Sequence, residues 1–272
     1  GHTHTICTWQ SLNILNKNTK KDQAEFPIEE FIKDVNCIMV DEVHMAKADV
    51  LKSLLTGPFS NIPIRWGLTG TVPKEEYEKM SLICSLGTVI NQLSASELQD
   101  KGVLANCHVN IIQTQDINSF RTYQEEVSYL TTNSERLKFL SNLIDDVRSG
   151  GNTLVLIDRI KSGEMLQELI PGSVFIQGKT KNEDREEEYG EIATEQHKVL
   201  VATYGIAAVG INIPRIFNLV LVEPGKSFVR VIQSIGRGIR KAQDKDHVQI
   251  WDITSACKFS KRHLTARKKF YK

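Results

Sequence analysis

The sequence lacks a marked excess of charge of either sign. Its 34 Lys and Arg residues are balanced by 33 Asp and Glu residues, which leaves a formal net charge of +1. Overall charge therefore does not indicate a nucleic-acid-binding protein, and any such binding must depend on local clusters. No apolar run approaches the roughly 20 residues that a membrane-spanning helix needs. No signal peptide is recognisable either, so we expect a cytoplasmic protein.

Cysteines are few and irregularly spaced. The chain has five, an odd number, and no two of them form a C-x-x-C pair: Cys7, Cys37, Cys84, Cys107 and Cys257. This pattern argues against a zinc site or a disulfide framework. We expect buried free thiols in a reducing compartment.

Short apolar runs alternate with helical stretches along the chain, which predicts an α/β fold with mainly parallel strands. The run Val35 to Val40 is apolar apart from Asn36, and we expect it to form a strand buried on both faces. Strands are expected at residues 35–40, 65–68, 107–113, 153–157, 173–177, 198–203, 218–222 and 248–253. Helices are expected at residues 74–84, 134–149 with Ser134 as N-cap, 161–170, 182–192 and 228–241. Mixed signals near residues 94–106 place the domain boundary there, giving domains 1–93 and 94–272.

Two adjacent acids, Asp41 and Glu42, follow the first apolar strand and are followed by Val43 and His44. Carboxylates at the end of a strand can hold Mg²⁺, which takes one or two carboxylates plus substrate phosphates. A second carboxylate beside the first can act as general base toward water. The other interpretation is a loop of solvated acids, which the preceding buried strand disfavours.

A second small motif, Leu68-Thr69-Gly70-Thr71, follows the next short strand. Hydroxyl residues around a glycine form a turn whose side chains can bridge two sites, although such turns are common at strand ends. Thr69 and Thr71 are therefore weak candidates by themselves, and their place in the same predicted sheet as Asp41 strengthens them.

The most specific motif is QSIGRGIR, residues 233–240. On a helix, Gln233, Arg237 and Arg240 share one stripe. Guanidinium forks suit phosphate oxygens, and an arginine finger can raise the rate of phosphoryl transfer by ~10³–10⁵. The alternative is an amphipathic basic surface helix.

Two further segments leave alternatives open. The strand ending at Thr203 runs into Gly205, Gly210 and Asn212, a loop that can meet phosphate or sugar or can simply join a strand to a helix. The stretch from Lys258 to the C-terminus contains Lys and Arg but no acid, and it is either a solvated helix or a phosphate-contacting tail.

In chain order, the segments TWQSL (residues 8–12), DEVH, LTGT, VLVATYGIAAVGINIP and QSIGRGIRK resemble the later motifs of superfamily 2 helicases. Within that superfamily they most resemble the phage UvsW-like branch-migration helicases and their XPB- and RecG-like relatives. DEVH in place of DEAD argues against the DEAD-box RNA helicases. The resemblance implies RecA-like parallel sheets, with part of a first lobe and a complete second lobe.

The resemblance also implies roles for the motif residues. Asp41 would hold the Mg²⁺ bound to ATP, with Glu42 beside it activating the water. His44 would couple the ATP site to the second lobe through Gln233, and the arginines would reach the γ-phosphate. Thr69 and Thr71 would link hydrolysis to lobe movement, and Gly210 and Asn212 would face the nucleotide. The nucleic-acid backbone would be met by Thr8, Gln10, Asp158, Arg159, Gly178, Lys179, Thr203 and Gly205.

Three features depart from the family pattern. The segment from Thr203 to Gly210 is one residue longer than is common, and Asn212 replaces an aspartate, which leaves a ribose contact open. No phosphate loop of the form G-x-x-x-x-G-K-[ST] is present. Gly178-Lys179-Thr180 has the last letters but lacks the earlier glycine. We expect this loop upstream of Gly1, so the chain alone should hydrolyse ATP poorly.

The sequence thus predicts a monomeric, ATP-dependent DNA helicase or translocase that remodels forks or junctions in replication, recombination or repair. A phage-encoded protein of this kind would act in the host cytoplasm. Three alternatives stay open: an RNA-directed helicase of the same superfamily, a non-catalytic nucleic-acid-binding module, and a restriction-type translocase subunit.

Overall fold

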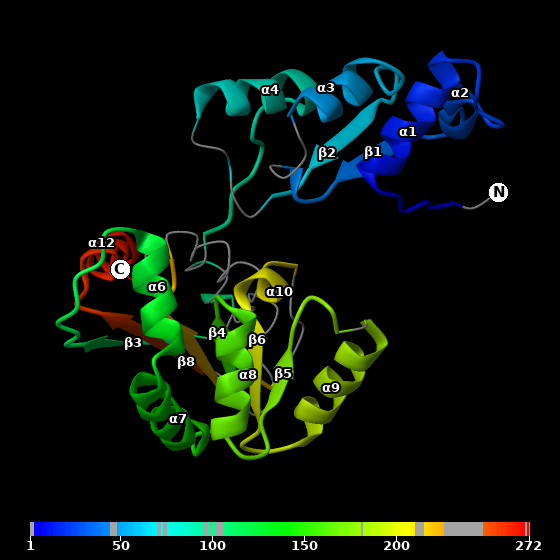
Figure 1. The fold of residues 1–272 in the computed structure, drawn as a ribbon. Helices are drawn as coiled ribbons and strands as arrows, with labels where there is room; N and C mark the ends of the chain where they lie inside the picture. The colour runs from blue at the N-terminus through cyan, green and yellow to red at the C-terminus, as the bar shows by residue number, and fades with distance from the viewer. Residues whose placement is uncertain are drawn as a thin grey trace. The chain divides into compact units, whose positions relative to one another are not determined.

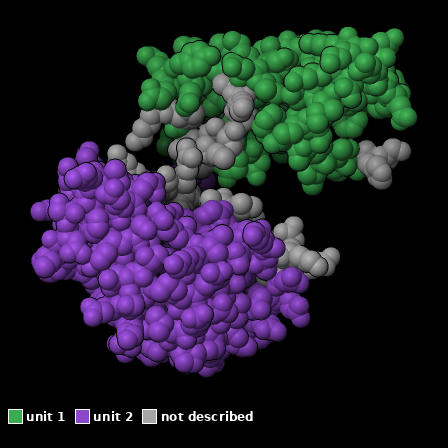
Figure 2. Space-filling view, viewed as in Figure 1, with its two compact units in different colours: residues 1–92 green, residues 93–272 purple. Residues whose placement is uncertain are grey.

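The computed structural model describes residues 3–271 apart from 44–47, 70–71, 73–74, 95–96, 98–99, 102–105, 181, 210–214, 226–246 and 270. The chain divides into two compact units, residues 1–92 and residues 93–272, which Figure 2 colours separately. Each unit has its own core. In the part of the chain that the structure describes, no helix combines the length and apolar character needed to cross a membrane.

Unit 1 is a two-stranded parallel sheet with helices packed against it. Its elements are α1 (Trp9–Lys20), α2 (Ile28–Ile32), β1 (Cys37–Val40), α3 (Ala48–Thr56), β2 (Ile64–Gly67) and α4 (Glu76–Leu86). The register places Cys37 opposite Ile64 and Val40 opposite Gly67. The core of unit 1 is formed by apolar residues of α2, of α3 and of the segments around them: Ile28, Val43, Leu51, Leu54, Leu55, Phe59 and Ile62. Ile38 and Val40 of β1 pack against this core.

The prediction that the first apolar strand is buried on both faces is wrong. In β1, Ile38 and Val40 are half-buried, whereas Cys37 and Met39 are exposed, Met39 to 60%. Trp66, which pairs with Met39 on β2, is also exposed, at 51%. Successive side chains of a strand point to opposite faces, and the helices of unit 1 cover the face of Ile38 and Val40.

Unit 2 contains a six-stranded parallel sheet in the order β3-β8-β7-β4-β6-β5. The strands are β3 (Asn106–Thr114), β4 (Thr153–Ile157), β5 (Val174–Ile176), β6 (Val199–Thr203), β7 (Asn218–Val222) and β8 (His247–Ser255). The helices are α6 (Tyr123–Thr132), α7 (Ser134–Arg148), α8 (Ile160–Leu169), α9 (Asn182–Thr194), α10 (Tyr204–Val209) and α12 (Lys258–Arg267) (Figure 1). The predicted α/β class with parallel strands is confirmed.

Both faces of this sheet are covered, as its continuously apolar strands require. On β4, Val155 and Ile157 pack with α7 and α8 on one face. Leu154 and Leu156 pack with α9 and α10 on the other. All five residues of β4 are buried, and so are those of β7. Because every strand in the sheet is parallel, its carboxyl ends lie at one edge.

Local details correct two predictions. The N-cap of α7 is Asn133 rather than Ser134, because the Asn133 side chain accepts a hydrogen bond from Arg136 N at 3.0 Å while Ser134 is already helical. Of the cysteines, only Cys257 is buried, and the other four are exposed. Cys37 lies on the open face of β1, and Cys107 lies on the edge strand β3. The predicted helix 228–241 lies outside the described residues.

Candidate functional site

The two acids of the DEVH motif directly follow β1. Asp41 and Glu42 are both exposed, and the Asp41 carboxylate accepts a hydrogen bond from Glu42 N at 2.8 Å. Glu42 has a φ of 45°, in the left-handed region that non-glycine residues adopt uncommonly. Such positions often mark turns or functional sites. Both carboxylates are therefore held at the strand end in a tight turn, open to solvent.

The LTGT motif meets this turn through the backbone. Leu68 N donates to Val40 O at 2.8 Å, and Val43 N donates to Leu68 O at 3.0 Å. These bonds extend the parallel pairing of β1 and β2 past the ends of the strands. Thr69, the next residue along the chain, is half-buried. The structure thus brings Asp41, Glu42 and Thr69 to one edge of the sheet.

This donor set fits a hydrated Mg²⁺ that arrives with a nucleotide. Mg²⁺ keeps several waters and is commonly bound through one or two carboxylates plus phosphates. Asp41 and Glu42 supply that number of exposed carboxylates. Among the described residues, no group of three or more His, Cys, Asp or Glu side chains could hold a metal ion by itself.

Thr8 and Gln10 lie at the start of α1. The Thr8 hydroxyl is the N-cap of this helix, accepting from Ser11 N at 3.2 Å, and it also lies 2.9 Å from Ser11 Oγ. Gln10 is exposed in the first turn. The Thr8 side chain thus has a structural role that the motif alone did not indicate, whereas Gln10 is open to a ligand.

Three strand ends of unit 2 gather residues that the sequence predicts to meet nucleic acid. Thr203 ends β6 and pairs with Ile157 of β4, so Asp158 and Arg159 follow beside it. Arg159 Nη2 donates to the backbone and side-chain oxygens of Gln124 at 3.3 Å and 3.2 Å, which attaches it to α6. Asp158 is exposed.

Gly178 and Lys179 follow β5, the neighbour of β6. They form the centre of a tight turn in which Thr180 N donates to Gln177 O at 2.9 Å and Gln177 N donates to Thr180 Oγ1 at 3.1 Å. Both central residues are exposed. The predicted contact residues of β4, β5 and β6 therefore share the carboxyl edge of the sheet, where ligands of open α/β sheets bind.

The segment after Thr203 is not the loop that the glycines predict. The helix α10 begins directly at Tyr204 and contains Gly205 in its first turn. The Tyr204 hydroxyl donates to Val222 O at 3.0 Å, which ties the helix to β7. Ile206 and Ala207 pack into the core, so tertiary burial favours a helix here. Gly205 itself is exposed.

Several predicted site residues lie outside the described residues. They are His44, Thr71, Gly210, Asn212, Gln233, Arg237 and Arg240.

Sequence reasoning missed a buried ionic cluster beside the carboxyl edge. Arg136 of α7 donates to Asp116 at 2.8 Å and to Glu223 at 2.5 Å, and Glu223 accepts from the Ser260 hydroxyl at 2.9 Å. Burial raises the pKa of Glu223 to about 7, although Arg136 and Ser260 favour its charged form. The partners lie far apart in sequence, so no local pattern signalled them.

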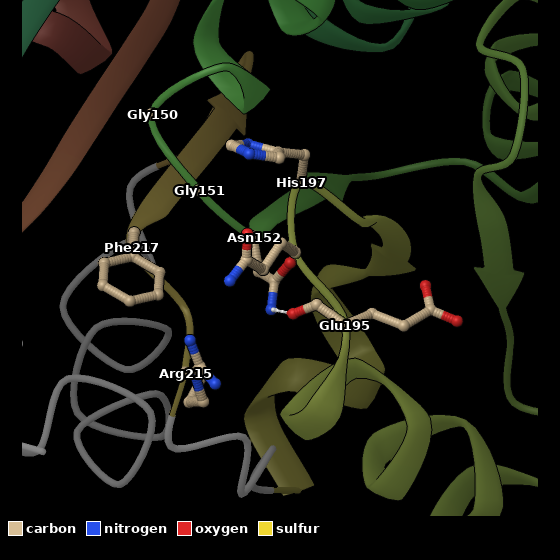
Figure 3. A pocket seen from close by; sticks show the side chains of 8 residues that line it. Gly150, Gly151, Asn152, Glu195, His197, Arg215 and Phe217 are labelled. Atoms are coloured by element: carbon tan, nitrogen blue, oxygen red, sulfur yellow. Dashed lines mark hydrogen bonds between the residues drawn. The ribbon is translucent and has the colours of Figure 1, made fainter. Parts of the chain in front are cut away.

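The opposite, amino-terminal edge of the sheet carries a small hollow of about 190 Å³. Figure 3 shows Asn152 in its wall, with the amide donating to the backbone oxygen of Glu195 at 2.9 Å. The same amide donates to Ile192 O at 2.8 Å, and its oxygen accepts from Lys198 N at 2.9 Å. These bonds join the starts of β4 and β6. None of the predicted site residues lines this hollow.

Comparisons with known proteins agree with the sequence motifs. The family "Helicase conserved C-terminal domain" matches residues 135–242. The chain is 24% identical over 253 residues to the "ATP-dependent DNA helicase uvsW" of Enterobacteria phage T4, covering 89% of this chain and 50% of that protein. It is 25% identical over 264 residues to "Putative helicase 22" of a Sulfolobus islandicus filamentous virus, covering 89% and 47%. The chain thus spans about half the length of these curated relatives.

Solved structures show the same fold. The crystal structure of T4 UvsW matches with a TM-score of 0.52 and 20% identity, covering 97% of this chain and 55% of that one. The helicase MrfA bound to DNA and AMPPNP matches with a TM-score of 0.65 and 13% identity, covering 95% and 36%. The six-stranded parallel sheet of unit 2 is that of a RecA-like helicase lobe. Residues 135–242 therefore match a helicase C-terminal domain, and the chain as a whole is similar to UvsW-like helicases of superfamily 2.

Proposed function

We propose that the full-length protein carrying this chain is an ATP-dependent DNA helicase or translocase. It would remodel forks or junctions during replication, recombination or repair. The proposal depends on one observation: the ends of β1 and β2 pair through backbone hydrogen bonds, which brings Asp41, Glu42 and Thr69 to the same edge of unit 1. It lies in a chain whose other unit carries a helicase C-terminal domain.

In this proposal the substrate is MgATP. Asp41 would bind the Mg²⁺, and Glu42 would accept a proton from the attacking water. Arg237 and Arg240 would stabilise the charge on the transferring phosphoryl group, a role that can contribute ~10³–10⁵ in rate. Thr69, at the same edge, would link ATP hydrolysis to movement of the lobes.

DNA would be held mainly through its backbone. The exposed residues Lys179, Gly178 and Gly205 lie at the carboxyl edge of unit 2, together with Thr203 and Asp158. Backbone binding of this kind tolerates many sequences and weakens steeply with salt. The T4 relative is described as an ATP-dependent DNA helicase, which supports DNA as the partner.

The proposal is tested by Glu42→Gln in the full-length protein. Loss of the general base should lower the rate of ATP hydrolysis by about 10²–10⁴, while the affinity for forked DNA stays unchanged. Arg240→Ala should likewise abolish hydrolysis and spare binding. Glu29→Gln, which changes an exposed acid on α2, is the matched control and should leave both properties unchanged.

Two results would contradict the proposal. Normal hydrolysis by Glu42→Gln together with weakened DNA binding would remove the catalytic assignment. Stronger stimulation of hydrolysis by duplex RNA than by forked DNA would favour an RNA-directed helicase of the same superfamily.

A further inference from the structure

The helix α12 lies outside the segment that matches the helicase family, residues 135–242, and carries a strong one-sided charge. Its buried residues are Ser260, His263, Leu264 and Arg267, which repeat at the spacing of one helix face. The exposed residues of the opposite face and the following turn are Lys258, Lys261, Arg262, Thr265, Lys268 and Lys269. Every ionisable group on this face, which we call the α12 basic face, is therefore a cation.

The buried side of α12 is attached firmly to the rest of unit 2. The Glu126 carboxylate of α6 accepts from Phe259 N at 3.0 Å, from Ser260 N at 2.7 Å and from the Ser260 hydroxyl at 2.8 Å. It thereby caps the amino end of a helix whose own N-cap, Cys257, makes no side-chain cap bond. Figure 1 shows α12 beside α6. The orientation of the α12 basic face is thus set by buried contacts.

At the other end of α12, Arg267 donates to both carboxylate oxygens of Asp252, at 2.9 Å and 2.8 Å. Asp252 belongs to β8 and is fully buried. The acids that pack against α12, including Glu126, are therefore turned inward and already bonded. Among the described residues, no ion pair joins the five exposed cations to an acid.

The cations at the amino end of α12 do not help the helix to fold. Lys258 and Arg262 are four residues apart, and like charges at that spacing destabilise a helix. Lys258 and Lys261 also lie near the amino end, where the helix dipole disfavours positive charge. The uncompensated charge is therefore better explained by an anionic partner than by the stability of unit 2.

The length and place of the face fit the backbone of a nucleic acid. At about 1.5 Å per residue, the stretch from Lys258 to Lys269 extends over about 16 Å, comparable with about five phosphates along one strand of B-DNA. The helix follows Ser255, the last residue of β8, so its amino end lies at the carboxyl edge that also carries Lys179 and Thr203.

We propose that the α12 basic face is a binding surface for the phosphate backbone of DNA. Phosphate contacts at this face would add to those proposed at the carboxyl ends of the strands of unit 2. That the nucleic acid is DNA rests on the proposed function. Binding there is independent of sequence, because Lys and Arg contacts to phosphates carry no base information.

The test compares variants of the 272-residue chain by fluorescence anisotropy with a labelled forked DNA at salt concentrations from about 50 to 200 mM. The triple variant Lys258→Gln/Lys261→Gln/Arg262→Gln removes three cations from the amino end of α12. Its affinity should fall at least about tenfold at low salt. The slope of log K against log salt should become shallower by about 2 to 3, because each lost phosphate contact removes about 0.9.

Two controls separate the surface from general charge and from folding. Lys17→Gln/Lys20→Gln/Lys21→Gln removes the same number of exposed cations from the end of α1 and should change the affinity less than twofold. The charge-retaining variant Lys258→Arg/Lys261→Arg/Arg262→Lys should bind like the unchanged chain. Thermal unfolding of the α12 glutamine variant should match that of the unchanged chain.

Equal losses in the two glutamine variants would overturn the proposal, since net charge alone would then explain binding. Unchanged affinity of the α12 variant, or no binding of DNA by the unchanged chain, would overturn it as well. The proposed function is judged separately by ATP hydrolysis in the full-length protein. If the full-length protein hydrolyses ATP in the presence of DNA but the α12 substitutions leave the affinity for DNA unchanged, only this inference is refuted.

Discussion

Replacing Arg267 by methionine should destabilise unit 2 strongly. Arg267 is 1% exposed and its partner Asp252 is fully buried. The guanidinium donates to both Asp252 oxygens and to the backbone oxygen of Pro224. Methionine fills a similar volume but offers no donor. Among the residues that the structure describes, the substitution leaves the buried Asp252 charge with only the Tyr271 hydroxyl as a partner.

The magnitude follows from the burial of the pair. Removing one partner of a buried ion pair costs about 3–5 kcal/mol, because the remaining charge is neither hydrated nor compensated. A typical domain has a free energy of unfolding of about 5–15 kcal/mol, so the loss would be a large part of the total. With an m-value of about 2 kcal/mol per M urea, the unfolding midpoint should fall by about 2 M.

Urea unfolding followed by tryptophan fluorescence measures this change. Of the three tryptophans, Trp251 is the one in unit 2 and adjoins Asp252 on β8. A background with Trp9 and Trp66 replaced by Phe therefore reports on unit 2 alone. Arg262→Met, on the exposed face of the same helix, is the matched control and should change the free energy of unfolding by no more than about 0.5 kcal/mol.

A double variant tests whether the unpaired charge of Asp252 causes the loss of stability in Arg267→Met. Adding Asp252→Asn to Arg267→Met removes that charge and should recover part of the lost stability. A loss below about 1 kcal/mol in Arg267→Met would refute the reasoning. Additive losses in the double variant would refute it too, because partners in a direct pair are expected to couple.

The other stability predictions concern one titrating group and one close contact. Burial raises the pKa of Glu223 to about 7 against opposition from Arg136 and Ser260, so the folded state keeps a proton that the unfolded chain, with a pKa near 4.5, releases. The free energy of unfolding should therefore fall as pH rises from about 4.5 to about 7 and level off above that pH. Urea unfolding measured across this pH range should show a weaker pH dependence for Glu223→Gln. An unchanged dependence of the free energy of unfolding on pH in that variant would count against the raised pKa. Gly163→Ala should cost about 1–3 kcal/mol because its Cβ would lie 2.3 Å from the Phe175 ring. Thermal unfolding measures that cost, and Phe175→Leu in the same chain should relieve it.

The acids of unit 1 illustrate how far sequence reasoning reaches. The adjacent Asp41 and Glu42 after an apolar strand, and Thr69 after the next strand, are local signals that place all three at strand ends. Parallel pairing then brings them to one edge, as the bond from Val43 N to Leu68 O shows. The open face of β1 was not foreseeable in this way, because an apolar run is the same whether one face is covered or two. Only the packing of the helices on Ile38 and Val40 reveals it.

The contacts of α12 illustrate the opposite case. Its basic composition is visible in the printed sequence, yet the choice between a solvated helix and a phosphate-contacting tail stays open there. The structure adds that Arg267 is buried against Asp252 while Lys261 and Arg262 are exposed. Identical charges thus have different roles according to the side of the helix on which they lie.

The amino-acid order by itself determined the alternation of strands and helices, because the apolar periodicity that specifies each element lies within that element. It also determined the motifs that relate the chain to superfamily 2 helicases. The tertiary structure alone decided which charges are buried together: Arg136 and Glu223 lie 87 residues apart and meet only after the strands have paired. The two partners of this buried ion pair come from distant parts of the chain, so no local pattern specifies it.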